Sequence, residues 1–438
     1  MIGLDGFPWT LARRLIEEGV MPNLGALAEE GDLVQMDSVY PTISGVAWSC
    51  FQTGKNPGKF GIYGFAELTS GMDLFVPDTS HLRSRTIWEI LADHGKKSIC
   101  LGVPVTYPPR PVDGIMVGGF LSPSLEKAVY PRSALPELIR LGYRIDIDPV
   151  KARESLDYFK KENLEVLEGR IRTLFACWEK DWWDLLMVHF MDSDRVNHFM
   201  FKYSQTREGG FESENHRYFF DFYSRIDQML GKVRSRLRED QTLIILSDHG
   251  FCPLKHEVQL NYWLADRGYL EFDHPPAHDL DFKAISPRSR AFSLVPGRVY
   301  LLREGVWGPG RLSPSQAEDL LGRIIEELRE MAGPGGEKVC RKVFRREEVF
   351  SGPFLDTAPD IVIDPQDGFD FKAGLKQSGC FTSGPINGMH TFSDALVLIR
   401  GRKEYSRRPV IWDLAPTLLE IFDIPLPPDL DGVSLGKG

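Results

Sequence analysis

Five short segments of this chain combine acidic, hydroxyl and histidine residues in a way that suits metal-assisted chemistry. Four of them follow apolar runs and the fifth precedes one; they are residues 2–6, 41–44, 191–198, 246–250 and 388–390. The candidate side chains are those of Asp5, Ser44, Asp194, His198, Asp248, His249 and His390. Three carboxylates, three imidazoles and a hydroxyl form a ligand set for two divalent metal ions with a nucleophile between them. The pattern indicates a hydrolase.

The spacing within these segments supports metal binding to different degrees. Asp194 and His198 stand four residues apart, which places both on one face of a helix, although many such pairs make only surface contacts. Asp248 and His249 follow the apolar run 242–246, and an adjacent acid and imidazole at a strand end are costly to bury unless a cation neutralises them. By itself, His390 would be interpreted as an ordinary loop histidine. The complete set is more informative than any member.

Ser44 is the candidate nucleophile. It opens the segment 44–51, which we expect to form the first turns of a helix, after the turn-like Pro41 and Thr42. Free amide groups and the helix dipole at such a position favour an alkoxide and a bound phosphoryl group. The commonest role of a serine there is an N-cap. Thr42 is the rival nucleophile.

The elements that must position these residues follow an α/β pattern. Apolar runs of strand length alternate with segments of helical period, which predicts a mostly parallel sheet covered by helices on both faces. We expect strands at residues 1–4, 97–103, 183–190, 242–246 and 395–399, and helices at 9–18, 23–30, 86–94, 156–178, 216–237, 314–331 and 413–421. Ligands collect at the carboxyl ends of parallel strands, where Asp5, Asp194 and Asp248 all fall.

The predicted division of the chain has two parts. Residues 1–251 and 388–438 would form the catalytic α/β core, and residues 252–387 an inserted α+β lobe at the rim of the site. The inserted segment contains a long amphipathic pattern and a strand-like run at 358–363.

Composition excludes several classes of protein. The chain has 438 residues, of which 42% are apolar, so it can bury a large core. Its formal net charge is −10 with both signs interspersed, so we expect no polymeric nucleic acid partner. There is no uninterrupted apolar run of about 18 residues, so we expect no membrane-spanning helix. Nothing in the sequence indicates an oligomeric state.

The cysteines and the N-terminal residues bear on the cellular compartment of the protein. The six cysteines are scattered without a Cys-x-x-Cys pair, which favours reduced core residues. The N-terminal residues lack a basic region followed by an apolar one, so we expect a cytoplasmic location. The strand before Asp5 is short, which leaves open that the native start lies upstream of Met1.

The order of these motifs resembles that of the type I phosphodiesterase/nucleotide pyrophosphatase family within the alkaline phosphatase superfamily. The resemblance rests on residues 2–6, 21–24, 41–44, 53–62, 194–198, 247–250, 388–390 and 413–417. It implies an alkaline-phosphatase-like fold and a small-molecule phosphodiester or pyrophosphate substrate.

The resemblance also implies a grouping of the ligands. Asp194, His198 and His390 would hold one metal ion; Asp5, Asp248 and His249 would hold the second, with Ser44 as the nucleophile at the metals. Three carboxylates and a serine alkoxide carry four negative charges, which match two divalent cations. Mixed nitrogen and oxygen ligands favour zinc, with manganese or iron as alternatives.

The sequence departs from the family pattern at three positions. Animal nucleotide pyrophosphatases have a threonine nucleophile and an asparagine three residues later that helps to hold phosphate; here these are Ser44 and Ala47. Phe60 stands where relatives often carry histidine. Arg195, Asn197 and Lys55 are candidates for the missing phosphate donor, although residues of these types are more often on the surface.

Several alternatives are open at this point. A phosphomonoesterase or a phosphonate hydrolase could use the same site. A phosphoglycerate-mutase-like enzyme would need a large domain inserted soon after the nucleophile, and a sulfatase would need Pro and Arg close behind the serine; neither is present. A non-catalytic binding module is disfavoured, since the buried carboxylates would then be uncompensated. His189 and His256 fit no ligand position and are expected to be core or supporting groups.

Overall fold

The computed structural model describes residues 1–205, 213–294 and 296–436. Within these residues the chain forms two compact units. The first comprises Met1–Lys55, Ser84–Cys252 and the C-terminal segment from Pro385, and the second comprises Asn56–Arg83 and Pro253–Gly384. Residues 56–83, which are predicted from the sequence to belong to the catalytic core, therefore lie in the second unit.

The first unit is built on an eight-stranded sheet in the order β2-β19-β9-β1-β8-β5-β6-β7. Its strands are β1 (Ile2–Leu4), β2 (Leu33–Met36), β5 (Ser98–Leu101), β6 (Gly114–Val117), β7 (Val129–Tyr130), β8 (Leu185–Phe190), β9 (Ile244–Leu246) and β19 (Ala395–Ile399). The five central strands from β9 to β6 run parallel, whereas β19, β2 and β7 are antiparallel to their neighbours. The predicted α/β class, a mostly parallel sheet between helices, is confirmed.

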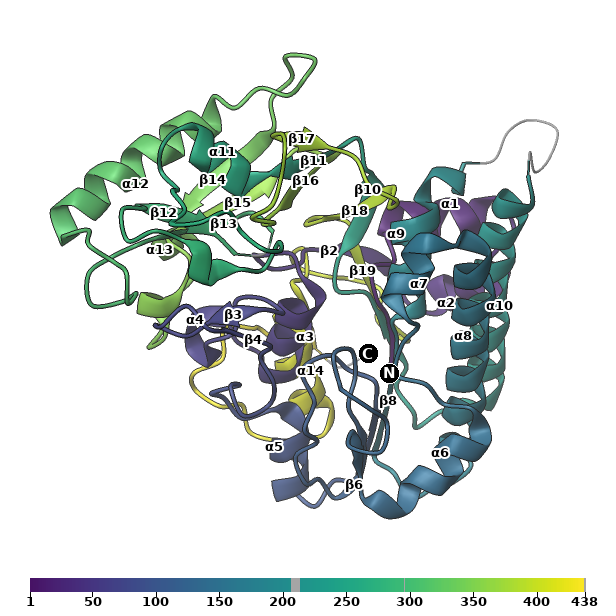
Figure 1. The fold of residues 1–438 in the computed structure, drawn as a ribbon. Helices are drawn as coiled ribbons and strands as arrows, with labels where there is room; N and C mark the ends of the chain where they lie inside the picture. Colours follow the sequence, from purple (N-terminus) through teal and green to yellow (C-terminus); the bar gives the residue numbers. More distant parts are fainter. Residues whose placement is uncertain (206–212, 295, 437–438) are drawn as a thin grey trace. The chain divides into compact units, whose positions relative to one another are not determined.

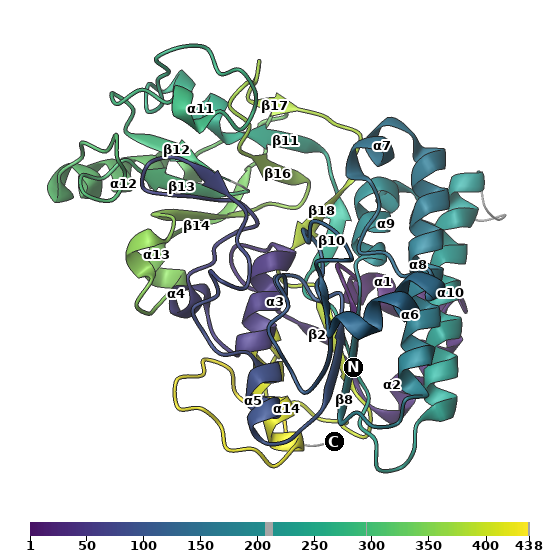
Figure 2. The same ribbon diagram turned by 60° about the horizontal axis from the view of Figure 1, so that its bottom comes forward.

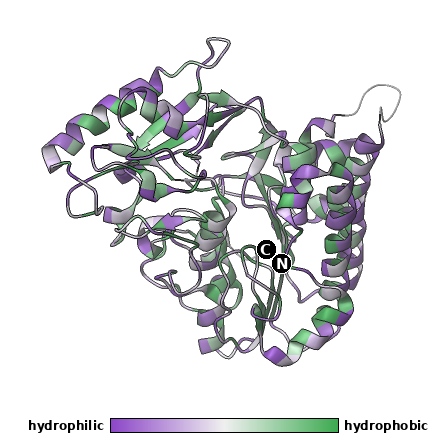
Figure 3. Ribbon diagram, in the orientation of Figure 1, coloured by the Kyte–Doolittle hydropathy of each residue, from purple (hydrophilic) through white to green (hydrophobic). Residues whose placement is uncertain are grey.

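Helices cover both faces of this sheet. They are α1 (Trp9–Glu17), α2 (Pro22–Glu30), α3 (Ser44–Thr53), α5 (Ile87–Asp93), α6 (Leu135–Leu141), α7 (Pro149–Glu154), α8 (Leu156–Trp178), α9 (Asp192–Met200), α10 (Glu214–Arg236) and α14 (Leu414–Ile421). The long helices α8 and α10 lie side by side with α1, α2 and α9 on one face, and α3, α5 and α14 pack together on the other (Figures 1 and 2). The central strands are buried on both faces, and they are mostly green, the colour of hydrophobic residues, in Figure 3. A sheet between two helical layers requires such apolar strands.

The predicted elements of this unit are present, with ends shifted by two residues at most. Three strands of the sheet, β2, β6 and β7, were not predicted. Their continuous apolar runs are three residues long at most, and β2 is only partly buried, so none has the longer apolar run that marks a central strand.

The second unit has its own core. Its four-stranded sheet has the order β12-β13-β15-β14, formed by Ala291–Ser293, Arg298–Leu301, Ile361–Pro365 and Cys340–Arg345, and helix α12 (Pro314–Arg329) packs on it. A three-stranded sheet joins β11 (His256–Gln259) to β16 (Phe369–Lys372) and β17 (Phe381–Thr382). The remaining elements are α4 (Pro57–Phe60), β3 (Glu67–Leu68), β4 (Leu74–Phe75), α11 (Leu260–Asp266) and α13 (Arg346–Val349).

A buried arginine ties together three segments of the first unit. Arg170 on α8 donates to the carboxylate of Asp192 at 2.9 Å, to the backbone carbonyl of Ile145 and to that of His189. Both side chains of the Arg170–Asp192 pair are 1% exposed. The pair therefore fixes the start of α9, the end of β8 and the loop around Ile145 relative to one another.

We expect Arg170→Met to lower the free energy of unfolding of the metal-free protein by about 3–5 kcal/mol, because it leaves Asp192 charged and buried without a partner. Denaturant or thermal unfolding of chelator-treated protein measures the effect. The double variant Arg170→Met/Asp192→Asn, which removes both charges, should lose less. A double variant as unstable as Arg170→Met would show that the ion pair is not the cause.

Candidate metal centre and nucleophile

Three adjacent parallel strands deliver the acidic residues to one edge of the sheet. Leu4 of β1 lies beside Phe190 of β8, and Gly3 lies beside Leu246 of β9. After each of these strands the chain runs directly into the site: Asp5 follows β1, α9 follows β8, and Asp248 follows β9. The side chains meet because carboxyl ends of neighbouring parallel strands share an edge.

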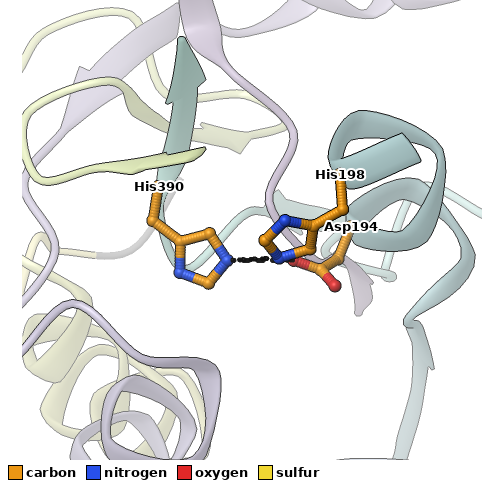
Figure 4. A group of neighbouring side chains, drawn as sticks. All are labelled: Asp194, His198 and His390. Carbon is orange, nitrogen blue, oxygen red and sulfur yellow. Dashed lines mark hydrogen bonds and ion pairs between the residues drawn. The ribbon is translucent and has the colours of Figure 1, made fainter. Parts of the chain in front are cut away.

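The first cluster consists of Asp194, His198 and His390. One ligand atom from each lies within 4.8 Å of the others. Asp194 Oδ1 is 3.4 Å from His198 Nε2 and 3.3 Å from His390 Nε2, and the two Nε2 atoms are 2.9 Å apart. Figure 4 shows the two rings, one from α9 and one from strand β18 (Gly388–Thr391), directing these nitrogens at each other beside the carboxylate.

The second cluster consists of Asp5, Asp194 and His249, whose ligand atoms also lie within 4.8 Å of one another. All three residues are buried. Asp248, predicted as a ligand here, lies at the margin: its Oδ2 is 3.4 Å from His249 Nε2, and its Oδ1 accepts the amide of Gly6 at 3.0 Å. Asp194 thus belongs to both clusters.

Ser44 points into the second cluster. Its Oγ donates to Asp5 Oδ1 at 3.1 Å and lies 3.2 Å from His249 Nε2. The N-cap of α3 is Ile43, so Ser44 is the first residue of the helix and its hydroxyl does not cap it. Thr42, the rival nucleophile, donates its hydroxyl to the backbone carbonyl of Val39 at 3.0 Å. Geometry therefore favours Ser44.

The three histidines share one arrangement of hydrogen bonds. In each, Nδ1 lies 3.1–3.2 Å from a backbone carbonyl: His198 pairs with Gly388, His390 with Thr42, and His249 with Gly250. A carbonyl partner requires the proton on Nδ1, which leaves the Nε2 lone pair directed at the carboxylates. This is the tautomer in which histidine binds a metal ion.

Asp5 is held by two groups that the ligand pattern did not reveal. Its Oδ2 accepts from His189 Nε2 at 2.7 Å and from Trp48 Nε1 at 2.8 Å, while its Oδ1 faces Ser44. From the sequence, His189 is expected to be a core or supporting group, whereas Trp48 is not among the candidate residues. A signal existed: Trp48 lies four residues after Ser44, on the same face of α3.

The electrostatics of the cluster are those of buried like charges. Burial raises the pKa of Asp248 well above its usual value, and the Asp5 carboxylate raises it further. Burial also tends to raise the pKa of Asp194, but His198, His390 and Arg195 outweigh it and lower this pKa. Among the described residues, Asp194 Oδ1 and Asp248 Oδ2 are buried without a hydrogen-bond partner. Buried carboxylate oxygens without a hydrogen-bond partner, next to imidazole lone pairs, are suitable ligands for divalent cations.

The candidates for a further phosphate donor differ in their surroundings. Asn197 is buried, donates to Gly6 O at 2.7 Å and accepts from Tyr223 at 2.9 Å. Lys55 pairs with Asp429. Arg195 lies beside the cluster, with Nη1 3.3 Å from Asp194 Oδ2. The expectation that these are surface residues is wrong, since Lys55 and Asn197 are buried and the side chain of Arg195 is only 15% exposed.

The fold is alkaline-phosphatase-like, a mostly parallel sheet between helices with two acid–histidine clusters at its carboxyl edge. The model of the family described as type I phosphodiesterase / nucleotide pyrophosphatase matches residues 1–393. The chain belongs to this family, which is metal-dependent and hydrolytic. No curated protein sequence matches the chain significantly.

Solved structures share the fold at low sequence identity. Phosphonoacetate hydrolase from Sinorhizobium meliloti, in complex with phosphonoformate, is 16% identical over 94% of this chain and 93% of that chain, with a TM-score of 0.62. Murine ectonucleotide pyrophosphatase / phosphodiesterase 5 is 16% identical over 97% and 95%, with a TM-score of 0.55. The human form is 15% identical over 99% and 96%, with a TM-score of 0.56. None of the described helices is long and apolar enough to cross a membrane.

We predict a pH dependence of stability that originates at His249. Burial and the facing His390 lower the pKa of His249 from 6.5 to about 3. The unfolded chain therefore binds a proton here that the folded chain does not, and stability falls as pH drops from about 6.5 toward 3. For metal-free protein, we expect His249→Gln to remove up to about 1.4 kcal/mol per pH unit of this loss.

Thermal unfolding of chelated protein at several pH values between 7 and 5 measures this slope. The exposed His274, replaced by glutamine, is the control and should leave the slope as in the parent protein. Equal slopes for His249→Gln and the parent would contradict a neutral His249 in the folded state.

Proposed function

We propose that this protein is a two-metal phosphodiesterase or nucleotide pyrophosphatase that acts through a phospho-seryl intermediate on Ser44. The observation that carries the proposal is the position of Ser44 Oγ, within 3.2 Å of both Asp5 and His249 at the start of α3. Membership of the family supports the reaction class.

The donor set supports the assignment of the metal ligands. Asp194, His198 and His390 would hold one ion, and Asp5, Asp248 and His249 the other, with Ser44 as a further ligand. Mixed imidazole and carboxylate donors favour Zn²⁺, with Mn²⁺ or iron as alternatives. When bound, two such ions would favour the deprotonated hydroxyl and stabilise negative charge on phosphoryl and leaving-group oxygens.

The residues of the chain divide the chemical work. Ser44 Oγ attacks phosphorus in line with the ester bond, and that bond breaks to release the first alcohol or phosphate product. The serine proton passes to solvent, and solvent supplies the proton that the leaving oxygen takes up. The amino end of α3 directs its dipole at the transferred phosphoryl group. Attack by water on phosphorus then breaks the bond to Ser44 Oγ and restores the hydroxyl. Asp5, held by His189 and Trp48, keeps the serine oxygen in place.

The nucleophile is tested by Ser44→Ala. We expect kcat to fall by at least about three orders of magnitude, as removal of a nucleophile does in other hydrolases, while both metal ions are retained. Metal content by mass spectrometry and turnover of a chromogenic diester measure the two effects. Thr42→Ala is the matched control, since its hydroxyl bonds to Val39, and should keep most activity. Loss of activity in Thr42→Ala with retention in Ser44→Ala would transfer the role to Thr42.

Substrate charge provides a second prediction. A monoester dianion needs a cationic partner, and the guanidinium of Arg195 is already bonded to Asp146 and Asp194. Since a charge-assisted hydrogen bond contributes roughly 1.5–3 kcal/mol, kcat/KM for bis-p-nitrophenyl phosphate should exceed that for p-nitrophenyl phosphate by at least about tenfold. The comparison should be made with zinc, manganese and iron in turn, with phosphonoacetate as a third substrate. A higher value for the monoester or the phosphonate would identify a phosphatase or a phosphonate hydrolase instead.

A further inference from the structure

Asp194 is the member of the cluster whose orientation matters most. It belongs to both groups of candidate ligands, one with His198 and His390 and the other with Asp5 and His249. Its Oδ1 faces the two histidines of the first group. A rotation of this one carboxylate would therefore disturb both groups together.

The other oxygen of Asp194 faces Arg195. Arg195 Nη1 lies 3.3 Å from Asp194 Oδ2. Side chains of adjacent helical residues do not face each other, so the contact requires something to direct the guanidinium. Asp146 does so: its carboxylate accepts from both Nε and Nη2 of Arg195, at 3.2 Å for Nε, in a two-point fork. Phe120 packs on the same guanidinium, with its ring centre 4.9 Å from Cζ.

The support continues beyond Asp146. The carbonyl of Ile145, the preceding residue, accepts from Arg170, and Asp146 also accepts the amide of Ile147 at 2.8 Å. Arg170 in turn holds Asp192, two residues before Asp194 on α9. The loop that carries Asp146 and the helix that carries Asp194 are thus anchored to the same buried arginine.

We infer that Arg195 is a positioning residue that fixes Asp194 as a ligand through Oδ1, and that Asp146 acts through Arg195. The inference rests on the proposed two-metal function. With Oδ2 bonded to the guanidinium, Asp194 is restricted to one oxygen toward the histidines. Arg195 and Asp146 carry opposite charges, so the pair adds direction without adding net charge to the site. The side chains of Arg195 and Asp146 are only 15% and 17% exposed, so solvent screens the attraction between their charges weakly.

The test measures metal affinity in chelated protein rather than turnover. We expect Arg195→Met to weaken zinc binding, measured by competition with a chromophoric chelator, by about 10- to 100-fold, the usual effect of losing a group that orients a ligand. Arg195→Lys keeps the charge but not the fork, and should restore part of the affinity. Asp146→Asn should weaken binding less than Arg195→Met does. The double variant should be no weaker than Arg195→Met, because Asp146 has no effect once Arg195 is absent.

Arg144→Met is the matched control. Arg144 lies on the same loop and makes an ion pair with Glu162 at 2.8 Å, away from Asp194. It should leave zinc affinity unchanged. Circular dichroism and thermal unfolding of the metal-free variants check folding; if Arg195→Met does not fold, Arg195→Lys and Asp146→Asn decide the question.

Unchanged zinc affinity in the folded Arg195 variants would overturn the inference, as would independent, additive losses from Arg195→Met and Asp146→Asn. Repeating the titrations in the Ser44→Ala background separates this inference from the proposed nucleophile. Weaker zinc binding there supports the positioning role whether or not Ser44 proves to be the nucleophile. A parent protein that binds no divalent metal would overturn both.

Discussion

The burial of three carboxylates at one edge of the sheet is the constraint on which the rest of the site depends. Asp5, Asp194 and Asp248 are 0–2% exposed, and like charges in such a setting repel one another with little screening. Burial tends to raise all three pKa values. Facing histidines outweigh it and lower the pKa of Asp5, histidines and Arg195 lower that of Asp194, and the pKa of Asp248 stays raised. Such an arrangement is costly in a folded protein unless cations compensate it.

The surroundings of the cluster are arranged to keep its ligand atoms directed inward. Backbone carbonyls fix the three histidines in one tautomer, and His189 with Trp48 fixes Asp5. Arg195, fixed by Asp146, occupies the outer oxygen of Asp194. Each contact uses a polar atom that faces away from the cluster, so it restrains the ligand without taking its place at a metal ion.

The departures from the family pattern now have a structural context. Ala47 lies on the first turn of α3 and offers no side-chain donor to a phosphoryl group there. Asn197 bonds to Gly6 and Tyr223, and Lys55 pairs with Asp429, so both side chains have partners other than the cluster. Under the proposed function, phosphate recognition would rest on the amino end of α3 and on the bound metal ions.

The class of fold and the residue types of the candidate site follow from sequence pattern alone. A continuous apolar run identifies a central strand because both faces of that strand are buried. A helical period identifies a helix because one face of it is buried. These patterns also place Asp5, Asp194 and Asp248 at strand ends, where a parallel sheet must bring them together. Short edge strands such as β2 and β7 carry no such signal and were missed.

How the side chains are used depends on the folded arrangement of the chain. That arrangement turned the hydroxyl of Ser44, and not that of Thr42, toward Asp5, and placed Asp194 in both clusters. It also placed Trp48 against Asp5 and Asp146 against Arg195, and it included residues 56–83 in the second unit. These outcomes depend on packing between segments far apart in the chain. Local periodicity records which face of an element is buried, but not which distant atom it meets there.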